Sequence, residues 1–146
     1  MALIRTECFI PASPDRVWAV LADFERYAEW NPLNVEARGQ ARLGAKIFTR
    51  FRNLAGDATK TVGQTVRIVA CEPGRELAWA GNVPLLFTGR HGFLLTAEGQ
   101  GTRVVQTEAL SGLLPLLWGE ARIARDFVPA YAEVDKALDA RVAALG

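Results

Sequence analysis

The chain has 146 residues, of which 50% are hydrophobic and 23% are charged, a composition typical of a folded globular protein rather than a disordered one. Its 17 basic and 16 acidic residues nearly balance, which argues against a dedicated nucleic-acid-binding protein, since such proteins carry a strong basic excess. Two cysteines (Cys8 and Cys71) and one histidine (His91) cannot complete a Cys₄ or Cys₂His₂ zinc site and are too few for a disulfide framework. We therefore expect no metal, no cofactor and two free thiols.

The sequence also bears on membrane association. Its longest stretch without a charged residue, 77–89, contains Gly81 and Pro84 and is too short to span a bilayer. Near the N-terminus, Arg5 and Glu7 interrupt the apolar run that a signal peptide would need. We expect a cytoplasmic protein without integral membrane association, folded as a single domain over residues 1–146.

The N-terminal third predicts a strand and two short helices. Residues 2–10 alternate loosely between apolar and polar side chains, which indicates a strand. Ser13 can accept a hydrogen bond from an unpaired helix amide and Pro14 suits the first helical position, so a helix begins here. Asp23 predicts the N-cap of a second short helix, which must end before Pro32.

Between residues 35 and 111 the pattern changes to short alternating segments separated by turn residues, which predicts about six antiparallel strands. In the segment 46–52 the odd positions are expected to face inward, so Lys46, Arg50 and Arg52 are expected to face outward. The other strands are expected near 62–71, 75–81, 87–97 and 102–110.

From Leu117 to the C-terminus, apolar residues recur mostly every three or four positions, which predicts one long amphipathic helix with a kink near Pro129. A curved antiparallel sheet has one face to cover, and a long helix can lie across it. Because one helix cannot fill the whole concave face, we expect a cavity between the sheet and this helix.

Several short motifs follow one another along the chain in a recognisable order. They are Ser13–Trp18, Asp23–Tyr27, Trp30–Pro32, Gly89–Phe93, Thr107–Glu108, Ser111–Leu113 and Ala137–Leu138. These motifs resemble those of the START/Bet v1-like superfamily, and in particular its polyketide cyclase/dehydrase and lipid transport group. The resemblance implies an α+β helix-grip fold, in which a curved seven-stranded antiparallel sheet wraps around a long C-terminal helix and two short helices follow the first strand. The fold hosts many activities, so the resemblance is specific for fold rather than for function.

The expected hairpin turns set the strand register. If Gly99 and Gln100 form a two-residue turn, His91 lies opposite Glu108. The same register pairs Phe93 with Gln106 and Leu95 with Val104, and the apolar members of this set suggest that it faces inward. The Pro73–Gly74 turn similarly places Trp79 opposite Ile68 and Leu77 opposite Ala70.

His91 and Glu108 are thus a candidate buried acid–base pair. Such a pair either orients a ligand or stabilises a polar patch, or it transfers protons. Aromatic residues between the sheet and the C-terminal helix are candidates for the cavity wall, whereas Trp118 is expected to cap the end of the barrel or to be partly exposed. The full set of candidate ligand-binding residues is Tyr27, Trp30, Phe51, Gln64, Trp79, His91, Phe93, Gln106, Glu108, Ala124, Phe127 and Tyr131.

Two surface features leave alternatives open. The apolar segments 83–87 and 113–117 either close the end of the core or form an entrance, a membrane-touching lip or a dimer contact. The range 38–60 contains Asp57 as its one acidic residue, and its basic surplus indicates a solvated edge or an anionic contact. Its basic residues are Arg38, Arg42, Lys46, Arg50, Arg52 and Lys60.

These observations favour a protein that binds a small hydrophobic or amphipathic ligand, such as a lipid, a polyketide-like compound or an aromatic compound. One alternative is a polyketide cyclase, aromatase or dehydratase that uses His91 and Glu108 for proton transfer. A second alternative is a regulatory module that binds a protein partner. Whether the chain forms a homodimer stays open.

Overall fold

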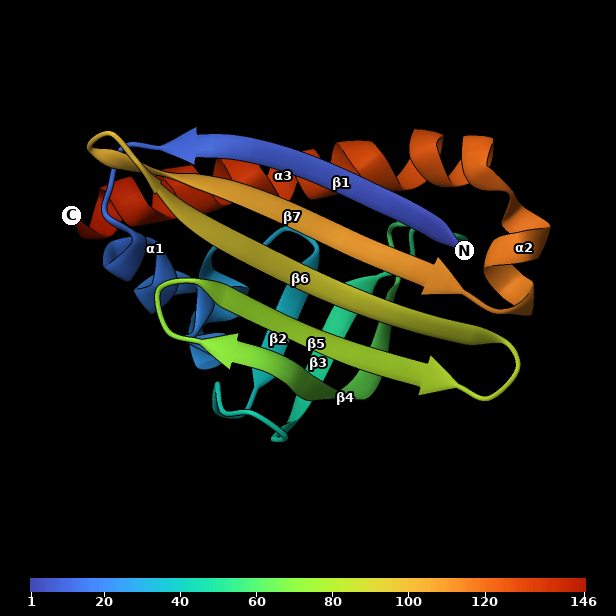
Figure 1. Cartoon of the computed structure of the whole chain (residues 1–146). Helices are drawn as coiled ribbons and strands as arrows, with labels where there is room; N and C mark the ends of the chain where they lie inside the picture. Colours follow the sequence, from blue (N-terminus) through green and yellow to red (C-terminus); the bar gives the residue numbers. More distant parts are fainter.

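The fold is built on one seven-stranded antiparallel sheet, described here from a computed structural model that covers residues 1–146 (Figure 1). The strand order β1-β7-β6-β5-β4-β3-β2 places the first strand beside the last and confirms the curved sheet that the sequence predicted. The strands are β1 (Ala2–Ile10), β2 (Asn34–Arg38), β3 (Lys46–Arg52), β4 (Thr61–Glu72), β5 (Glu76–Val83), β6 (Phe87–Glu98) and β7 (Gly101–Ser111).

The helices lie at the ends and along one side of this sheet. The long helix α3 (Glu120–Leu145) runs beside β1, with α1 (Pro14–Leu21) near its C-terminal end and α2 (Leu113–Trp118) before its N-terminal end (Figure 1). A short 3₁₀ helix, η1 (Phe24–Glu29), packs against β2. The side chains of Val134, Leu138 and Val142 on α3 are buried in one apolar core together with Ile4 of β1.

The two predicted N-terminal helices are present, with one difference in capping. The backbone N–H of Arg16 donates a hydrogen bond of 3.3 Å to the Ser13 hydroxyl, as expected for an N-cap. Asp23 occupies the N-cap position of η1, as predicted, but its side chain makes no capping hydrogen bond. The second helix forms because Phe24 and Tyr27 are both buried in the core on one side of this turn.

The prediction of a single helix from Leu117 onward is wrong at its start. Gly119 adopts a φ of +79°, a conformation that favours glycine, and so separates α2 from α3. The run of leucines in 113–117 belongs to the short helix α2, and the long helix α3 begins at Glu120. Pro129 lies inside α3 without ending it.

The β6–β7 register is the predicted one, with His91 opposite Glu108, Phe93 opposite Gln106 and Leu95 opposite Val104. Trp79 pairs with Ile68 as expected. The predicted pairing of Leu77 with Ala70 is wrong, because a β-bulge between Ile68 and Ala70 shifts β4 and brings Leu77 opposite Cys71.

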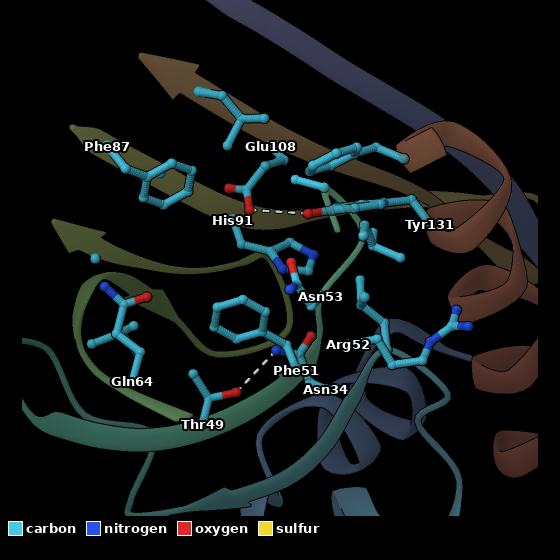
Figure 2. A pocket seen from close by; sticks show the side chains of 18 of the residues that line it. Asn34, Thr49, Phe51, Arg52, Asn53, Gln64, Phe87, His91, Glu108 and Tyr131 are labelled. Carbon is cyan, nitrogen blue, oxygen red and sulfur yellow. Dashed lines mark hydrogen bonds between the residues drawn. The ribbon is translucent and has the colours of Figure 1, made fainter. Parts of the chain in front are cut away.

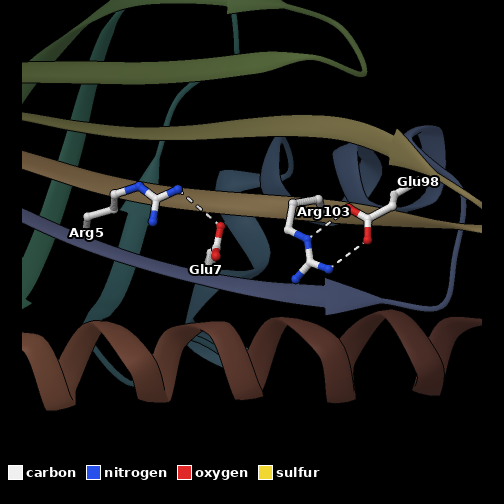
Figure 3. Close-up of polar contacts among 4 residues, drawn as sticks. All are labelled: Arg5, Glu7, Glu98 and Arg103. Atoms are coloured by element: carbon white, nitrogen blue, oxygen red, sulfur yellow. Dashed lines mark hydrogen bonds and ion pairs between the residues drawn. The ribbon is translucent and has the colours of Figure 1, made fainter.

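Charged side chains mark the outer face of the sheet. On β1, Arg5 and Glu7 form an ion pair of 3.1 Å (Figure 3). Beside it, Arg103 of β7 makes hydrogen bonds of 3.0 and 2.8 Å to Glu98 at the end of β6. On β3, the guanidinium of Arg50 lies over the ring of Phe48 on the same outer face. Exposed ion pairs of this kind contribute about 0.2–1 kcal/mol each, so they indicate orientation more than they stabilise the fold.

Arg52 departs from the outward orientation predicted for it. It is the last residue of β3, where its backbone N–H bonds the carbonyl of Leu33 just before β2 begins. At this strand end the alternation no longer holds, and Arg52 contributes to the wall of the cavity described below. Both cysteines are free, and none of the helices combines the length and the apolar composition needed to cross a membrane.

Candidate functional site

A cavity of about 120 Å³ lies between the sheet and α3 (Figure 2). Its inner wall consists of buried residues, among them Trp79 of β5, His91 of β6, and Phe127 and Tyr131 of α3. Residues that are partly exposed, such as Leu54, Phe87 and Trp118, line its outer part. The cavity therefore has a buried deep end and a mouth formed by the β3–β4 loop, the β5–β6 hairpin and α2.

Seven of the candidate binding residues line the cavity: Phe51, Gln64, Trp79, His91, Glu108, Phe127 and Tyr131. They come from β3, β4, β5, β6, β7 and α3, and the alternation of inward and outward residues is the pattern that singled out the strand residues among them. Five other candidates do not line it: Tyr27, Trp30, Phe93, Gln106 and Ala124.

Three of these five residues lie outside the cavity wall, for reasons that differ between them. Tyr27 is buried in the core, where its hydroxyl donates a 2.6 Å hydrogen bond to the carbonyl of Leu21, and Trp30 packs edge-on against its ring. Ala124 is exposed, because α3 turns Ile123 and Phe127 toward the core instead. The inward placement of Ala124 is wrong.

The other two residues, Phe93 and Gln106, lie behind His91. The ring of Phe93 stacks against that of His91 at 5.2 Å, and the Gln106 side chain bonds the imidazole from β7. They support the cavity wall without reaching the cavity.

The sequence analysis missed several polar residues of the wall, above all Asn34, Thr49 and Arg52. Thr49 was expected to face inward but was not singled out, because threonine is common in strands. The Asn34 amide nitrogen donates a 2.9 Å hydrogen bond to the Thr49 hydroxyl, a cross-strand contact that a bulge in β2 makes hard to foresee. Trp118, expected at the barrel end, packs against Phe87 and Phe127 at the mouth.

The predicted direct contact between His91 and Glu108 is not formed, although the two residues face each other across β6 and β7. His91 Nε2 instead bonds Gln106 Oε1 at 2.8 Å, and Glu108 Oε1 accepts a 3.0 Å hydrogen bond from the Tyr131 hydroxyl (Figure 2). Helix α3 is the reason, because it supplies Tyr131 to Glu108 and also holds the Gln106 amide through Asp135 at 2.9 Å.

Burial keeps the deep end of the cavity uncharged at neutral pH. It lowers the pKa of His91 to about 4, although the hydrogen bond that His91 makes to Gln106 acts in the opposite direction. It raises the pKa of Glu108 to about 8, although the Tyr131 hydrogen bond acts in the opposite direction. Burial also raises the pKa of Tyr131 well above its ordinary value. Near pH 7 the imidazole is neutral, the carboxyl group is protonated and the phenol keeps its proton.

Three buried side-chain atoms in the chain have no hydrogen-bond partner: Asn34 Oδ1, Arg52 Nε and Glu108 Oε2. All three residues line this one cavity. Buried polar groups in native proteins are nearly always paired, and each exception asks for an explanation. Their concentration here makes this cavity the candidate functional site.

The chain matches the family model described as polyketide cyclase / dehydrase and lipid transport over residues 1–145. It belongs to this family. No curated protein matches the sequence.

Solved structures from the START/Bet v1-like superfamily share the fold. A START superfamily protein from Mycobacterium smegmatis superposes with a TM-score of 0.80 at 15% identity over 99% of both chains. The Zhui aromatase/cyclase from Streptomyces sp. R1128 superposes with a TM-score of 0.75 at 15% identity, over 97% of this chain and 93% of its own. A protein from Thermus thermophilus reaches 0.76 at 23% identity over 99% of both chains. At these identities the likeness concerns the fold alone, and it confirms the helix-grip architecture.

In this member of the polyketide cyclase/dehydrase and lipid transport family, the mouth carries an exposed apolar lip. The lip comprises Val83, Leu85, Leu86, Leu113, Leu116 and Leu117. Backbone N–H groups of Leu113 and Leu114 donate to the carbonyls of Leu85 and Leu86, which joins α2 to the β5–β6 hairpin. Leu85, Leu116 and Leu117 are 85%, 78% and 79% exposed, so these segments do not close the core as one of the alternatives held.

Proposed function

We propose that the chain binds a small hydrophobic or amphipathic molecule in the cavity between the sheet and α3. The observation that carries this proposal is the convergence of the unpaired buried atoms of Asn34, Arg52 and Glu108 on one cavity. Leaving such an atom unpaired costs about 1–3 kcal/mol, whereas a ligand with matching polar atoms would recover this free energy on binding. The apolar wall would hold the rest of the molecule.

The size of the cavity limits the part of the ligand that it encloses. Its volume of about 120 Å³ is slightly smaller than the roughly 150 Å³ apolar cavity that accommodates benzene in an engineered protein. The deep end therefore fits a group of about one six-membered ring. Any longer part of the ligand would extend through the mouth toward the apolar lip.

The expected affinity follows from the apolar area that becomes buried. A single ring of about 200 Å² gains roughly 5 kcal/mol at about 25 cal/mol per Å². The loss of translational and rotational freedom cancels much of this gain, so apolar contacts alone give weak binding. Polar contacts with the unpaired atoms are then what brings affinity and selectivity.

Isothermal titration calorimetry with small ring compounds tests the proposal. We expect one-to-one binding, accompanied by a change in tryptophan fluorescence, because Trp79 and Trp118 line the cavity. Competition between two ligands of different ring type should show a single shared site. If a panel of small aromatic and alicyclic compounds gives neither heat nor a fluorescence change, the proposal is wrong.

A second candidate function is acid–base catalysis on a carbonyl compound, and the protonated Glu108 carboxyl group favours it. A carboxyl group that keeps its proton near pH 7 can donate a hydrogen bond to a ligand carbonyl oxygen, while neutral His91 can accept a proton from the adjacent carbon. The description of the family to which the chain belongs, polyketide cyclase / dehydrase and lipid transport, includes reactions of this kind.

Deuterium exchange at the α-carbon of a small cyclic ketone, followed by NMR in D₂O, tests this second candidate. Catalysis predicts exchange that is faster with the protein than without it and that is lost in the His91→Phe variant, which has no side chain to accept the proton. An exchange rate equal to that of buffer would leave binding as the sole proposed function.

A further inference from the structure

The Gln106 amide determines which nitrogen of His91 carries the proton. Gln106 Nε2 lies 3.0 Å from the backbone carbonyl oxygen of Tyr131, which can only accept a hydrogen bond, so the amide NH₂ group must point there. Its Oε1 then faces His91 Nε2 at 2.8 Å and accepts a hydrogen bond from it. Because the buried imidazole is neutral, His91 is the Nε2–H tautomer and Nδ1 keeps a free lone pair.

Nδ1 is therefore the hydrogen-bond acceptor that His91 offers to the cavity. It makes no hydrogen bond within the chain, and His91 lines the cavity wall. The ring is held in place by Trp79, whose centroid lies 4.8 Å away, and by Phe93 at 5.2 Å. The acceptor is fixed in direction as well as in protonation state.

Glu108 provides a matching donor. Its Oε1 accepts the hydrogen bond from the Tyr131 hydroxyl, while Oε2 is buried without a partner. In the neutral acid the proton resides on the oxygen that does not accept, so Oε2 carries an O–H group toward the cavity. An ionised carboxylate would leave a charge and a bare oxygen in an apolar setting, which is the costlier state.

One ligand oxygen can reach both groups. His91 and Glu108 are directly opposite on β6 and β7, and such pairs have Cβ atoms about 4.5–5.5 Å apart on the same face. Figure 2 shows the Glu108 carboxyl group, the Tyr131 hydroxyl and the His91 ring together at one end of the cavity. A group that donates to Nδ1 and accepts from Oε2 would satisfy both side chains at once.

Charge at this end argues against an anionic group. Arg52 is the one permanently basic residue in the lining, and no basic side chain contributes to the pKa of Glu108. A carboxylate or phosphate would therefore bring an uncompensated charge beside a buried carboxyl group. A purely apolar group would leave Nδ1 and Oε2 without partners.

We propose that the deep end of the cavity is a subsite for a neutral hydroxyl group on an apolar ring, which donates a hydrogen bond to His91 Nδ1 and accepts one from Glu108 Oε2. Gln106 and Asp135 are positioning residues, because the hydrogen bond between them fixes the Gln106 amide that sets the tautomer of His91. This inference rests on the proposed ligand-binding function and adds the chemistry of the bound group.

Calorimetric titration with four probes of one skeleton tests the subsite: 4-methylphenol, 4-methylanisole, 4-methylbenzoate and 1,4-dimethylbenzene. 4-Methylphenol and 1,4-dimethylbenzene have nearly the same shape and differ in a hydroxyl for a methyl group. We expect 4-methylphenol to bind at least tenfold more tightly than each of the other three. If 1,4-dimethylbenzene binds one-to-one with equal affinity, or 4-methylbenzoate binds more tightly, ligand binding stands and the hydroxyl subsite is wrong. If none of the four binds, the proposed function fails together with the subsite.

Two variants at Glu108 sharpen the comparison. Glu108→Gln keeps an acceptor for Tyr131 and a donor toward the cavity, so it should retain the preference for 4-methylphenol. Glu108→Leu removes the donor and should reduce that preference to within about twofold. An unchanged preference in a folded Glu108→Leu protein would overturn the assignment.

The tautomer has its own measurement, which is independent of any ligand. His91 is the one histidine in the chain, so its ring nitrogens can be assigned without ambiguity in a long-range ¹H–¹⁵N NMR spectrum. We expect a protonated Nε2 and an unprotonated Nδ1 at pH 7, with the Nδ1 resonance shifting when 4-methylphenol binds. The opposite tautomer would contradict the proposal.

Discussion

His91 and Glu108 face each other across β6 and β7, yet each forms its hydrogen bond with a different side chain. His91 bonds Gln106 on the diagonal of the same strand pair, and Glu108 bonds Tyr131 of α3. The two groups therefore remain able to bind a third partner between them, which a direct imidazole–carboxyl hydrogen bond would prevent. This separation is the feature on which the proposed site depends.

The buried carboxyl group predicts a pH dependence of stability. Burial raises the pKa of Glu108 to about 8 in the folded chain from an ordinary value of 4.5, so between these values the unfolded chain loses a proton that the folded chain keeps. Raising the pH through this window lowers the free energy of unfolding by roughly 1.4 kcal/mol per pH unit from this group. Glu108→Gln removes the effect.

Urea denaturation of wild type and Glu108→Gln at several pH values measures it. The difference in free energy of unfolding, variant minus wild type, should grow from pH 5 to pH 8 and level off above pH 8. The contribution of His91 cancels in this difference, because it is present in both proteins. A difference that does not change with pH would show that Glu108 titrates normally.

His91 predicts the opposite dependence on the acid side. Its pKa is lowered from 6.5 to about 4, so below pH 6.5 the unfolded chain takes up a proton that the folded chain does not. Acidification from pH 6.5 to pH 4 should therefore destabilise wild type more than His91→Gln. Parallel pH profiles of the two proteins in urea denaturation would contradict the buried neutral imidazole.

The hydrogen-bond partners predict which pairs of residues are energetically coupled. In a double-mutant cycle, His91→Phe and Gln106→Met should couple by about 0.5–1.5 kcal/mol, because they share a buried hydrogen bond of 2.8 Å. The cycle of His91→Phe with Glu108→Gln is the comparison and should show weaker coupling, because these two side chains share no hydrogen bond. Stronger coupling to Glu108 than to Gln106 would mean that the imidazole bonds the carboxyl group directly.

Filling the cavity should abolish binding without unfolding the protein. Val66 lines the cavity on β4, so Val66→Phe is expected to raise the Kd for 4-methylphenol at least tenfold. Ala124→Phe is the matched control, because Ala124 is exposed on α3, and it should leave the Kd unchanged. Wild-type affinity in a folded Val66→Phe protein would place the binding site elsewhere.

The lip stores backbone strain that a substitution can release. Leu85 has a φ of +67° and an exposed side chain, and this conformation costs an L-residue roughly 1–2 kcal/mol. Glycine adopts this φ without strain, but it also increases the conformational entropy of the unfolded chain, which offsets part of the gain. Leu85→Gly should therefore raise the free energy of unfolding by up to about 1 kcal/mol. Leu116→Gly, at an exposed position within α2, should lower it by about 0.5–1 kcal/mol. Equal losses in both variants would contradict the strain at Leu85.

The sequence was sufficient for the sheet register around the site. Inward and outward side chains alternate strictly, and the turn at Gly99 and Gln100 leaves one register that buries Phe93, Leu95 and Val104 together. The same logic missed the β4–β5 pairing at Leu77, because an inserted bulge residue leaves no clear signal in an apolar strand.

What the sequence could not provide is the rotation and position of α3 against the sheet. Small alanine residues flank the apolar face of this helix, so the sequence alone does not show that Ile123 rather than Ala124 turns toward the core. That choice turned Ala124 outward and brought Tyr131 and Asp135 over Glu108 and Gln106. The hydrogen-bond partners at the site depend on this packing, so His91, Glu108 and Tyr131 could be singled out from the sequence but their pairing could not.

A crystal structure of the complex with 4-methylphenol tests the central claim most directly. We expect electron density for one ring in the cavity beside Trp79 and Phe127, with the ligand oxygen within hydrogen-bond distance of Glu108 Oε2 and His91 Nδ1. Density for the ring at another surface, or a cavity that is closed by its own side chains in the crystal, would contradict it.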